Sequence, residues 1–255
     1  MENKENSKTE LVIKDIDSKN EIDISTQKEG FKSISLVKKL SLFLVGCFGI
    51  YLISLILLLI FKAASGGTYD EGILEFIVYT ILFVILAAIV NVDVKKLKVD
   101  FKKWQNILIG LGFGIVMIVI PIIYTTVVSL FYEYSINDNE SSLRAIIKVY
   151  PVASVFIFAI VGPVCEELTY RVGLFGSLSK IKWLAYVITI LLFAFAHFSF
   201  TSKHIIDELV NLPIYLISGA IMAIAYDKFG FLASTTAHIA NNLYAVIGTI
   251  IAVNM

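Results

Sequence analysis

Long apolar runs dominate this sequence, and several are about as long as a helix must be to cross a lipid bilayer. Crossing the hydrocarbon core takes about 20 mostly apolar residues in an α-helix. We predict an all-α fold, a polytopic integral membrane bundle of about seven transmembrane helices. The candidate spans are 40–61, 73–92, 107–131, 150–175, 183–201, 211–226 and 231–253. The sixth of these, 211–226, is short for a full crossing and could be tilted or partly re-entrant.

The composition agrees with this class and excludes others. Hydrophobic residues make up 58% of the 255 residues and charged residues 16%, whereas a soluble domain is about half apolar and a quarter charged. The net charge of zero argues against nucleic acid as a partner and leaves membrane lipid as the surrounding medium. Because Cys47 and Cys165 both lie in apolar runs, a disulfide scaffold and a Cys-rich zinc module are also excluded.

The chain divides into three predicted regions. Residues 1–32 alternate Lys with Asp and Glu, and such a segment cannot bury enough apolar surface to offset its ordering entropy. We predict a flexible polar tail there, N-terminal transmembrane helices over 33–144 and a transmembrane core over 145–255. In the second region, Gly110 and Gly114 stand at the spacing that favours close helix packing within the chain over dimerisation.

Basic residues gather in alternate loops, and this pattern predicts the orientation. Short cytoplasmic loops carry an excess of Lys and Arg. We therefore predict a cytoplasmic N-terminus, and the frequent use of Lys, Ile and Asn favours a bacterial plasma membrane. The residues that set this orientation are Lys32, Lys38, Lys39, Lys95, Lys96, Lys98, Lys102, Lys103, Lys180 and Lys182.

Three ionisable residues lie close together in the fourth predicted span, where such residues mark a functional site by default. Glu167 and Arg171 are four residues apart on one helical face and can form an ion pair. Glu166 points roughly 100° away from that face and has no equally well placed cation. We therefore expect Glu167 to be structural and Glu166 to be a general base or acid, although all three could form one structural cluster.

Two of the three histidines also lie in late predicted spans. His197 shares a helical face with Phe193, whose ring can fix the imidazole, and His238 shares a face with Asn242. A shared depth with the glutamates requires the helix that carries His197 to tilt or to extend past Phe200.

The polar segment that follows this helix includes the third histidine. We expect His204 to lie in a loop, with Asp207 and Glu208 facing water.

Two routes to amide hydrolysis fit these groups. Glu166, His197 and His238 could bind zinc as a His₂Glu set with an open position for water. Alternatively, Glu166 and His197 could activate water directly while His238 and Asn242 stabilise the oxyanion. The residues therefore leave open whether the site uses a metal cofactor. Cys165 is a poor nucleophile, because a thiol in hydrocarbon surroundings stays protonated.

Three motifs, in this order and in three different spans, carry a family resemblance over residues 145–255. The sequence resembles the CPBP family of CAAX proteases and bacteriocin-processing enzymes, also called Abi proteins. The motifs are Glu166-Glu167-x-x-x-Arg171, Phe193-x-x-x-His197 and His238-x-x-x-Asn242.

The resemblance implies an intramembrane endopeptidase that acts on a small hydrophobic or lipidated peptide or protein, with 145–255 as its catalytic core. By this resemblance, Glu166 and His197 would activate water and His238 with Asn242 would complete the centre. Glu167, Arg171 and Phe193 would support them. The family has been described both as metalloproteases and as glutamic proteases, and the sequence slightly favours the glutamate route because Asn is a poor zinc ligand.

Two other functions remain as alternatives. One is a non-catalytic immunity or scaffold protein of the same family. The other is a secondary transporter, which we disfavour because the paired halves typical of transporters are absent from the sequence.

Overall fold

A computed structural model describes residues 30–66, 68–91 and 103–254 of the chain. All regular structure in these ranges is helical. Six helices are long and apolar enough to cross a membrane: Leu36–Ala64, Glu71–Val90, Gln105–Ser129, Pro151–Leu178, Ile205–Phe229 and Phe231–Val253. The predicted polytopic helical membrane bundle is thus confirmed. Most of the predicted tail, 1–29, and most of the Lys-rich second loop, 92–102, lie outside the described residues.

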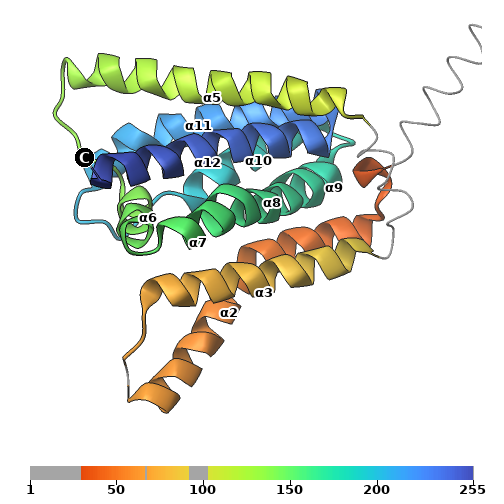
Figure 1. Cartoon of the computed structure of the whole chain (residues 1–255). Coiled ribbons are helices and arrows are strands. Elements are labelled where there is room, and N and C mark those ends of the chain that lie inside the picture. Colours follow the sequence, from red (N-terminus) through yellow and green to blue (C-terminus); the bar gives the residue numbers. More distant parts are fainter. Residues whose placement is uncertain (1–29, 67, 92–102, 255) are drawn as a thin grey trace, which may run out of the picture.

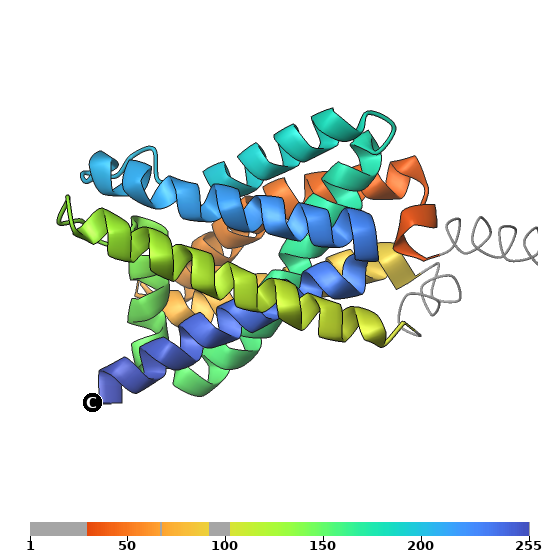
Figure 2. The ribbon, with the colours of Figure 1, turned by 90° about the horizontal axis from the view of Figure 1, so that it is seen from above.

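The helices lie side by side in tiers. In Figure 1, α5, α11 and α12 lie above the continuous helical run from α7 to α9, and α2 and α3 lie below it. Figure 2 shows α5 running across both α11 and α12, which it contacts. The described elements are η1 (Phe31–Ser33), α2 (Leu36–Ser65), α3 (Glu71–Asn91), α5 (Gln105–Ser129), α6 (Asp138–Val149), α7 (Pro151–Phe156), η2 (Ile157–Val161), α8 (Gly162–Glu166), η3 (Glu167–Phe175), α9 (Gly176–Leu178), α10 (Lys182–Ala196), α11 (Ile205–Phe229) and α12 (Phe231–Asn254).

The short apolar helix is α10 and not the sixth predicted span. Its 15 residues extend about 22 Å, less than the roughly 30 Å of a hydrocarbon core. Of the two alternatives given for a shared depth, extension past Phe200 does not occur, because the helix ends at Ala196 and leaves His197 at its C-cap. The sixth span is longer than predicted, because α11 begins at Ile205 and has 25 residues.

The segment before α2 is packed against the bundle. Phe31 is 4% exposed, and its ring stacks on Phe231 at a centroid distance of 4.1 Å. Lys32 Nζ donates a hydrogen bond to the carbonyl oxygen of Asp227 at 2.9 Å. Both residues fall within the predicted flexible tail, so the packed part of the chain begins before the predicted boundary.

Two glycines let α5 approach α12 closely. A Cβ on Gly110 would lie 2.6 Å from the carbonyl oxygen of Ala233, and one on Gly114 would lie 2.8 Å from the Cβ of Ala240. The pair therefore packs against a helix of the same chain, as predicted. A Cβ on Gly112, between them, would meet no atom of another described element within 4 Å.

Replacing the packed glycines should destabilise the bundle. We expect Gly110→Leu or Gly114→Leu to lower the thermal unfolding midpoint in detergent, because overpacking costs about 1–3 kcal/mol or more. Gly112→Leu is the matched control and should unfold at nearly the wild-type temperature. Equal effects at all three positions would contradict this packing.

Candidate active site

The helical run that carries the two glutamates changes its winding at the glutamates themselves. α8 ends at Glu166, and the π-helical segment η3 begins at Glu167. π-Helical turns are rare in proteins, and those that occur are frequently at functional sites. The regular helical spacing assumed from the sequence therefore does not hold here. Every residue of η3 is buried, so this segment lies at the centre of the bundle.

Glu167 and Arg171 form a fully buried ion pair in η3. Glu167 Oε2 lies 3.4 Å from Arg171 Nε, and both side chains are 0% exposed. The guanidinium carbon of Arg171 also lies 5.0 Å from the ring centroid of Phe193. The pair expected from the sequence is thus present, and the aromatic face gives the cation a second favourable neighbour.

The other carboxylate oxygen of Glu167 orients a histidine. Its Oε1 lies 3.1 Å from Nδ1 of His238 on α12. A carboxylate accepts only, so Nδ1 of His238 carries the proton in this bond. The opposite ring nitrogen, Nε2, then faces Glu166, and lies 3.7 Å from its Oε2. Glu167 therefore orients His238 so that Nε2 of this histidine faces Glu166.

Glu166 meets both histidines of the motifs. Its Oε2 lies 3.8 Å from Nε2 of His197 and 3.7 Å from Nε2 of His238. Among the described residues, this oxygen has no hydrogen-bond partner although it is buried. These separations exceed direct hydrogen bonds, so the three groups face one another without bonding directly. The three groups converge although α10 ends at Ala196, so no extension of that helix is needed to bring His197 to Glu166.

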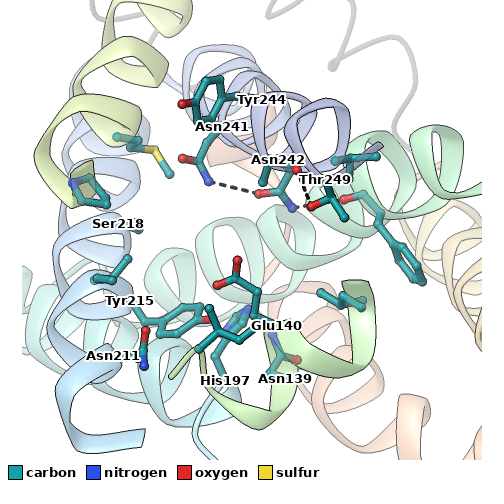
Figure 3. A pocket seen from close by; sticks show the side chains of 18 of the residues that line it. Asn139, Glu140, His197, Asn211, Tyr215, Ser218, Asn241, Asn242, Tyr244 and Thr249 are labelled. Carbon is teal, nitrogen blue, oxygen red and sulfur yellow. Dashed lines mark hydrogen bonds between the residues drawn. The ribbon is translucent and has the colours of Figure 1, made fainter. Parts of the chain in front are cut away.

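His197 is held at three points. Its Nδ1 lies 2.9 Å from the carbonyl oxygen of Phe193, so a neutral ring donates from Nδ1 and leaves Nε2 free to accept. The ring packs beside Phe193 at a centroid distance of 4.7 Å. It also stacks on Tyr215 of α11 at 4.7 Å and 20° (Figure 3). Phe193 supports the histidine as expected, whereas Tyr215 had no distinguishing sequence signal in its apolar run.

Asn242 lies near this group without touching it. Its Nδ2 donates to the carbonyl oxygen of Phe158 at 3.1 Å, and its Oδ1 accepts from Nδ2 of Asn241 at 3.3 Å (Figure 3). No described hydrogen bond joins it to Glu166 or to either histidine. Its predicted role in oxyanion stabilisation thus stays a prediction.

A cavity of about 480 Å³ joins these residues. Figure 3 shows Asn241 and Asn242 on one side of it and His197 and Tyr215 on another. Helix α6, which lies between two of the predicted spans, supplies a further polar wall. The cavity-lining residues include Met117, Ile118, Pro121, Asn139, Glu140, Arg144, Glu166, His197, Asn211, Tyr215, Ser218, His238, Asn241 and Asn242.

The predicted zinc ligands have suitable chemistry, since both imidazoles have their second nitrogen fixed by a carboxylate or carbonyl, as metal-binding histidines do. However, within the described ranges no group of three or more His, Cys, Asp or Glu side chains has an arrangement that could hold a metal ion. The arrangement thus does not fit a preformed zinc site, and zinc binding by Glu166, His197 and His238 stays a prediction.

Removing only the cation of the buried pair should destabilise the protein strongly. Arg171→Met leaves Glu167 charged and less compensated in an apolar interior, which costs about 3–5 kcal/mol when a buried pair is broken. The double variant Glu167→Gln/Arg171→Met should recover part of this loss. Denaturation in detergent, arranged as a double-mutant cycle, measures the coupling, and a cycle with no coupling would contradict the pair.

Comparison with known proteins finds a similar family and two similar proteins. Residues 148–244 match the family described as type II CAAX prenyl endopeptidase Rce1-like. The chain is 28% identical over 163 residues to the membrane-embedded CAAX protease MroQ of Staphylococcus aureus, covering 57% of this chain and 62% of that protein. It is 25% identical over 152 residues to the UPF0177 protein YvdC of Lactococcus lactis, covering 59% and 55% respectively.

The chain thus spans less than two thirds of the length of either relative. No solved structure gives a significant match. The matched stretch contains all four predicted catalytic residues, Glu166, His197, His238 and Asn242. The matches thus confirm the resemblance to the CPBP family that the motifs predicted, and residues 148–244 are similar to its Rce1-like CAAX protease members.

Proposed function

We propose that this protein is an intramembrane endopeptidase that hydrolyses a peptide bond in a small hydrophobic or lipidated peptide or protein. One observation carries the proposal: the unpartnered Oε2 of Glu166 faces Nε2 of both His197 and His238 at 3.7–3.8 Å. The three residues line a cavity inside a bundle of helices long and apolar enough to cross a membrane. The match of residues 148–244 to a family of CAAX prenyl endopeptidases supports the same reaction class.

The proposed reaction starts with a water held between Glu166 and His197. As the water oxygen attacks the carbonyl carbon of the substrate, Glu166 accepts its proton as general base. In this proposal Nε2 of His238 also carries a proton and donates it in a hydrogen bond to the developing oxyanion. The protonated Glu166 then transfers its proton to the leaving nitrogen as the C–N bond breaks, which gives a carboxylic acid and an amine.

Asn242 has a secondary role in this proposal. To stabilise the oxyanion, its amide would exchange the hydrogen bond to the Phe158 carbonyl oxygen for one to the substrate. This exchange is compatible with its place on the cavity wall. The cost of leaving the Phe158 carbonyl without that donor makes Asn242 a weaker contributor than His238.

The cavity supports a peptide substrate of mixed polarity. Met117, Ile118 and Pro121 of α5 form an apolar wall, whereas Asn241 and Asn139 offer carboxamides. Carboxamides can pair with a peptide backbone while the apolar wall receives side chains or a lipid group. We also propose a cytoplasmic N-terminus, which rests on the distribution of lysines along the chain, and a bacterial plasma membrane location, which rests on the frequent use of Lys, Ile and Asn.

Removing the base or the oxyanion donor should abolish cleavage. With purified protein in detergent, we expect Glu166→Gln and His238→Ala to lower the turnover of internally quenched peptides about 10²–10⁴-fold. The probes are an apolar peptide with one cysteine and the same peptide farnesylated on that cysteine. Glu133→Gln, at an exposed loop glutamate, makes the same chemical change away from the cavity and should retain activity.

Circular dichroism and the unfolding midpoint should show that both inactive variants remain folded. If peptide cleavage, or the cellular effect of the protein, survives both substitutions, the protein acts as a non-catalytic immunity or scaffold factor and the proposal fails.

The glutamate mechanism also predicts activity without a metal. Elemental analysis of the purified protein should find zinc well below one atom per chain, and cleavage should persist after treatment with EDTA and 1,10-phenanthroline. Stoichiometric zinc, together with chelator inhibition that added zinc reverses, would instead establish Glu166, His197 and His238 as a metal site.

A further inference from the structure

Glu208 is a buried carboxylate that the proposed reaction does not use. The sequence predicts that it faces water, because it lies in a polar stretch next to Asp207, and this prediction is wrong. Its side chain is 1% exposed, in the first turn of α11. A carboxylate taken out of water is costly unless hydrogen bonds or a cation compensate it, so its partners need to be identified.

Both oxygens of Glu208 accept hydrogen bonds from backbone amides. Oε1 accepts from the amide of Asp138 at 2.8 Å, and Oε2 accepts from the amide of Ser199 at 2.9 Å. Within the described ranges, Glu208 forms no salt bridge with a basic side chain. One carboxylate therefore ties the start of α6 to the loop that follows α10.

The position favours a carboxylate over an amide. Asp138 is the first residue of α6, and Glu208 is in the first turn of α11, so two helix N-termini contribute positive potential at the same carboxylate. The side chain must also accept two N–H groups at once. A glutamine has one acceptor oxygen, and its NH₂ group would face the second N–H donor.

The two segments that Glu208 joins, the loop after α10 and the start of α6, both lie next to His197. Ser199 follows His197 by two residues, and Asn137, which precedes Asp138, donates from Nδ2 to the carbonyl oxygen of His197 at 2.9 Å. The hydroxyl of Tyr215 donates to Oδ1 of Asn137 at 3.2 Å. Since the Tyr215 ring also stacks on His197 (Figure 3), this network fixes both the backbone and the ring of the histidine.

We propose that Glu208 is a positioning residue for His197: it fixes the loop after α10 against α6 and so holds the imidazole opposite Glu166. It also holds α6, which supplies Asn139, Glu140 and Arg144 to the cavity wall. The effect on catalysis rests on the proposed function, whereas the effect on the imidazole does not.

The chain offers a direct measurement, because it contains only three histidines. Ring ¹⁵N-labelled histidine gives NMR signals for His197, His204 and His238 in detergent micelles, and single substitutions of each histidine assign them. In the wild type, the ¹⁵N shifts of His197 should report one tautomer, protonated at Nδ1. In Glu208→Gln, the His197 signal should broaden or shift toward a mixture of tautomers, while the His238 signal stays in place.

Asp207→Asn is the matched control, because it removes the same charge from the adjacent residue in the same helical turn. We expect its histidine spectrum to equal that of the wild type. Glu208→Asp keeps the charge and both acceptor oxygens on a shorter side chain, and should give an intermediate spectrum even if Glu208→Gln does not fold.

Turnover of the quenched peptides gives a second readout. We expect Glu208→Gln to lower kcat about 10- to 100-fold, as small displacements of catalytic groups do, with KM within about threefold if the cavity wall keeps its shape. Glu208→Asp should restore part of that kcat.

A folded Glu208→Gln with an unchanged His197 signal would overturn this proposal and leave Glu208 as a helix cap that affects stability only. If Glu208→Gln does not fold, an unchanged His197 signal in Glu208→Asp would overturn it equally. Failure of the wild type to cleave any peptide would contradict the proposed function, and the histidine spectra would still decide the role of Glu208.

Discussion

The arrangement of the whole centre depends on a buried charge network in η3. The carboxylate of Glu167 lies between the guanidinium of Arg171 and the imidazole of His238, with both members of its ion pair fully buried. Charges in such an interior persist only when they compensate one another. Because Glu167 is occupied in this way, Glu166 is the carboxylate left to face the cavity, and His238 is held with Nε2 toward it.

Helix packing then brings both histidines to Glu166. α10 ends at Ala196, and His197 at its C-cap has Nε2 3.8 Å from Oε2 of Glu166. The π-helical winding of η3 and the close approach of α5 to α12 at Gly110 and Gly114 set the surrounding packing. Three side chains, from α8, the C-cap of α10 and α12, therefore meet, with Nε2 of each histidine 3.7–3.8 Å from Oε2 of Glu166.

The sequence was sufficient for the class of fold and for the identity of the converging residues. Apolar runs of about 20 residues predict membrane helices because lipid leaves few alternatives, and the rarity of ionisable residues in them singled out Glu166, Glu167 and Arg171. The Glu167–Arg171 pair was predicted from an i, i+4 spacing and is present, although the segment that carries it is π-helical instead of α-helical. Features that depend on local chemistry within one helix could thus be predicted.

Features that depend on contacts between segments far apart in the sequence could not be predicted. Glu208 looked solvated because hydropathy counts a carboxylate as polar, although backbone amides at Asp138 and Ser199 compensate its burial. Tyr215 and helix α6 carried no distinguishing signal, and their role depends on where α6 and α11 meet His197. The resemblance covered only 145–255, yet α5 lines the cavity with Met117 and Pro121, so the N-terminal helices complete the site.

The most direct test of the central claim is an experimental structure in lipid nanodiscs, at a resolution that shows ordered water. The account predicts one water within hydrogen-bonding distance of both Glu166 Oε2 and His197 Nε2, with His238 Nε2 adjacent. A structure in which Glu166 points toward the acyl chains, or in which the two imidazoles lie apart from it, would contradict the account.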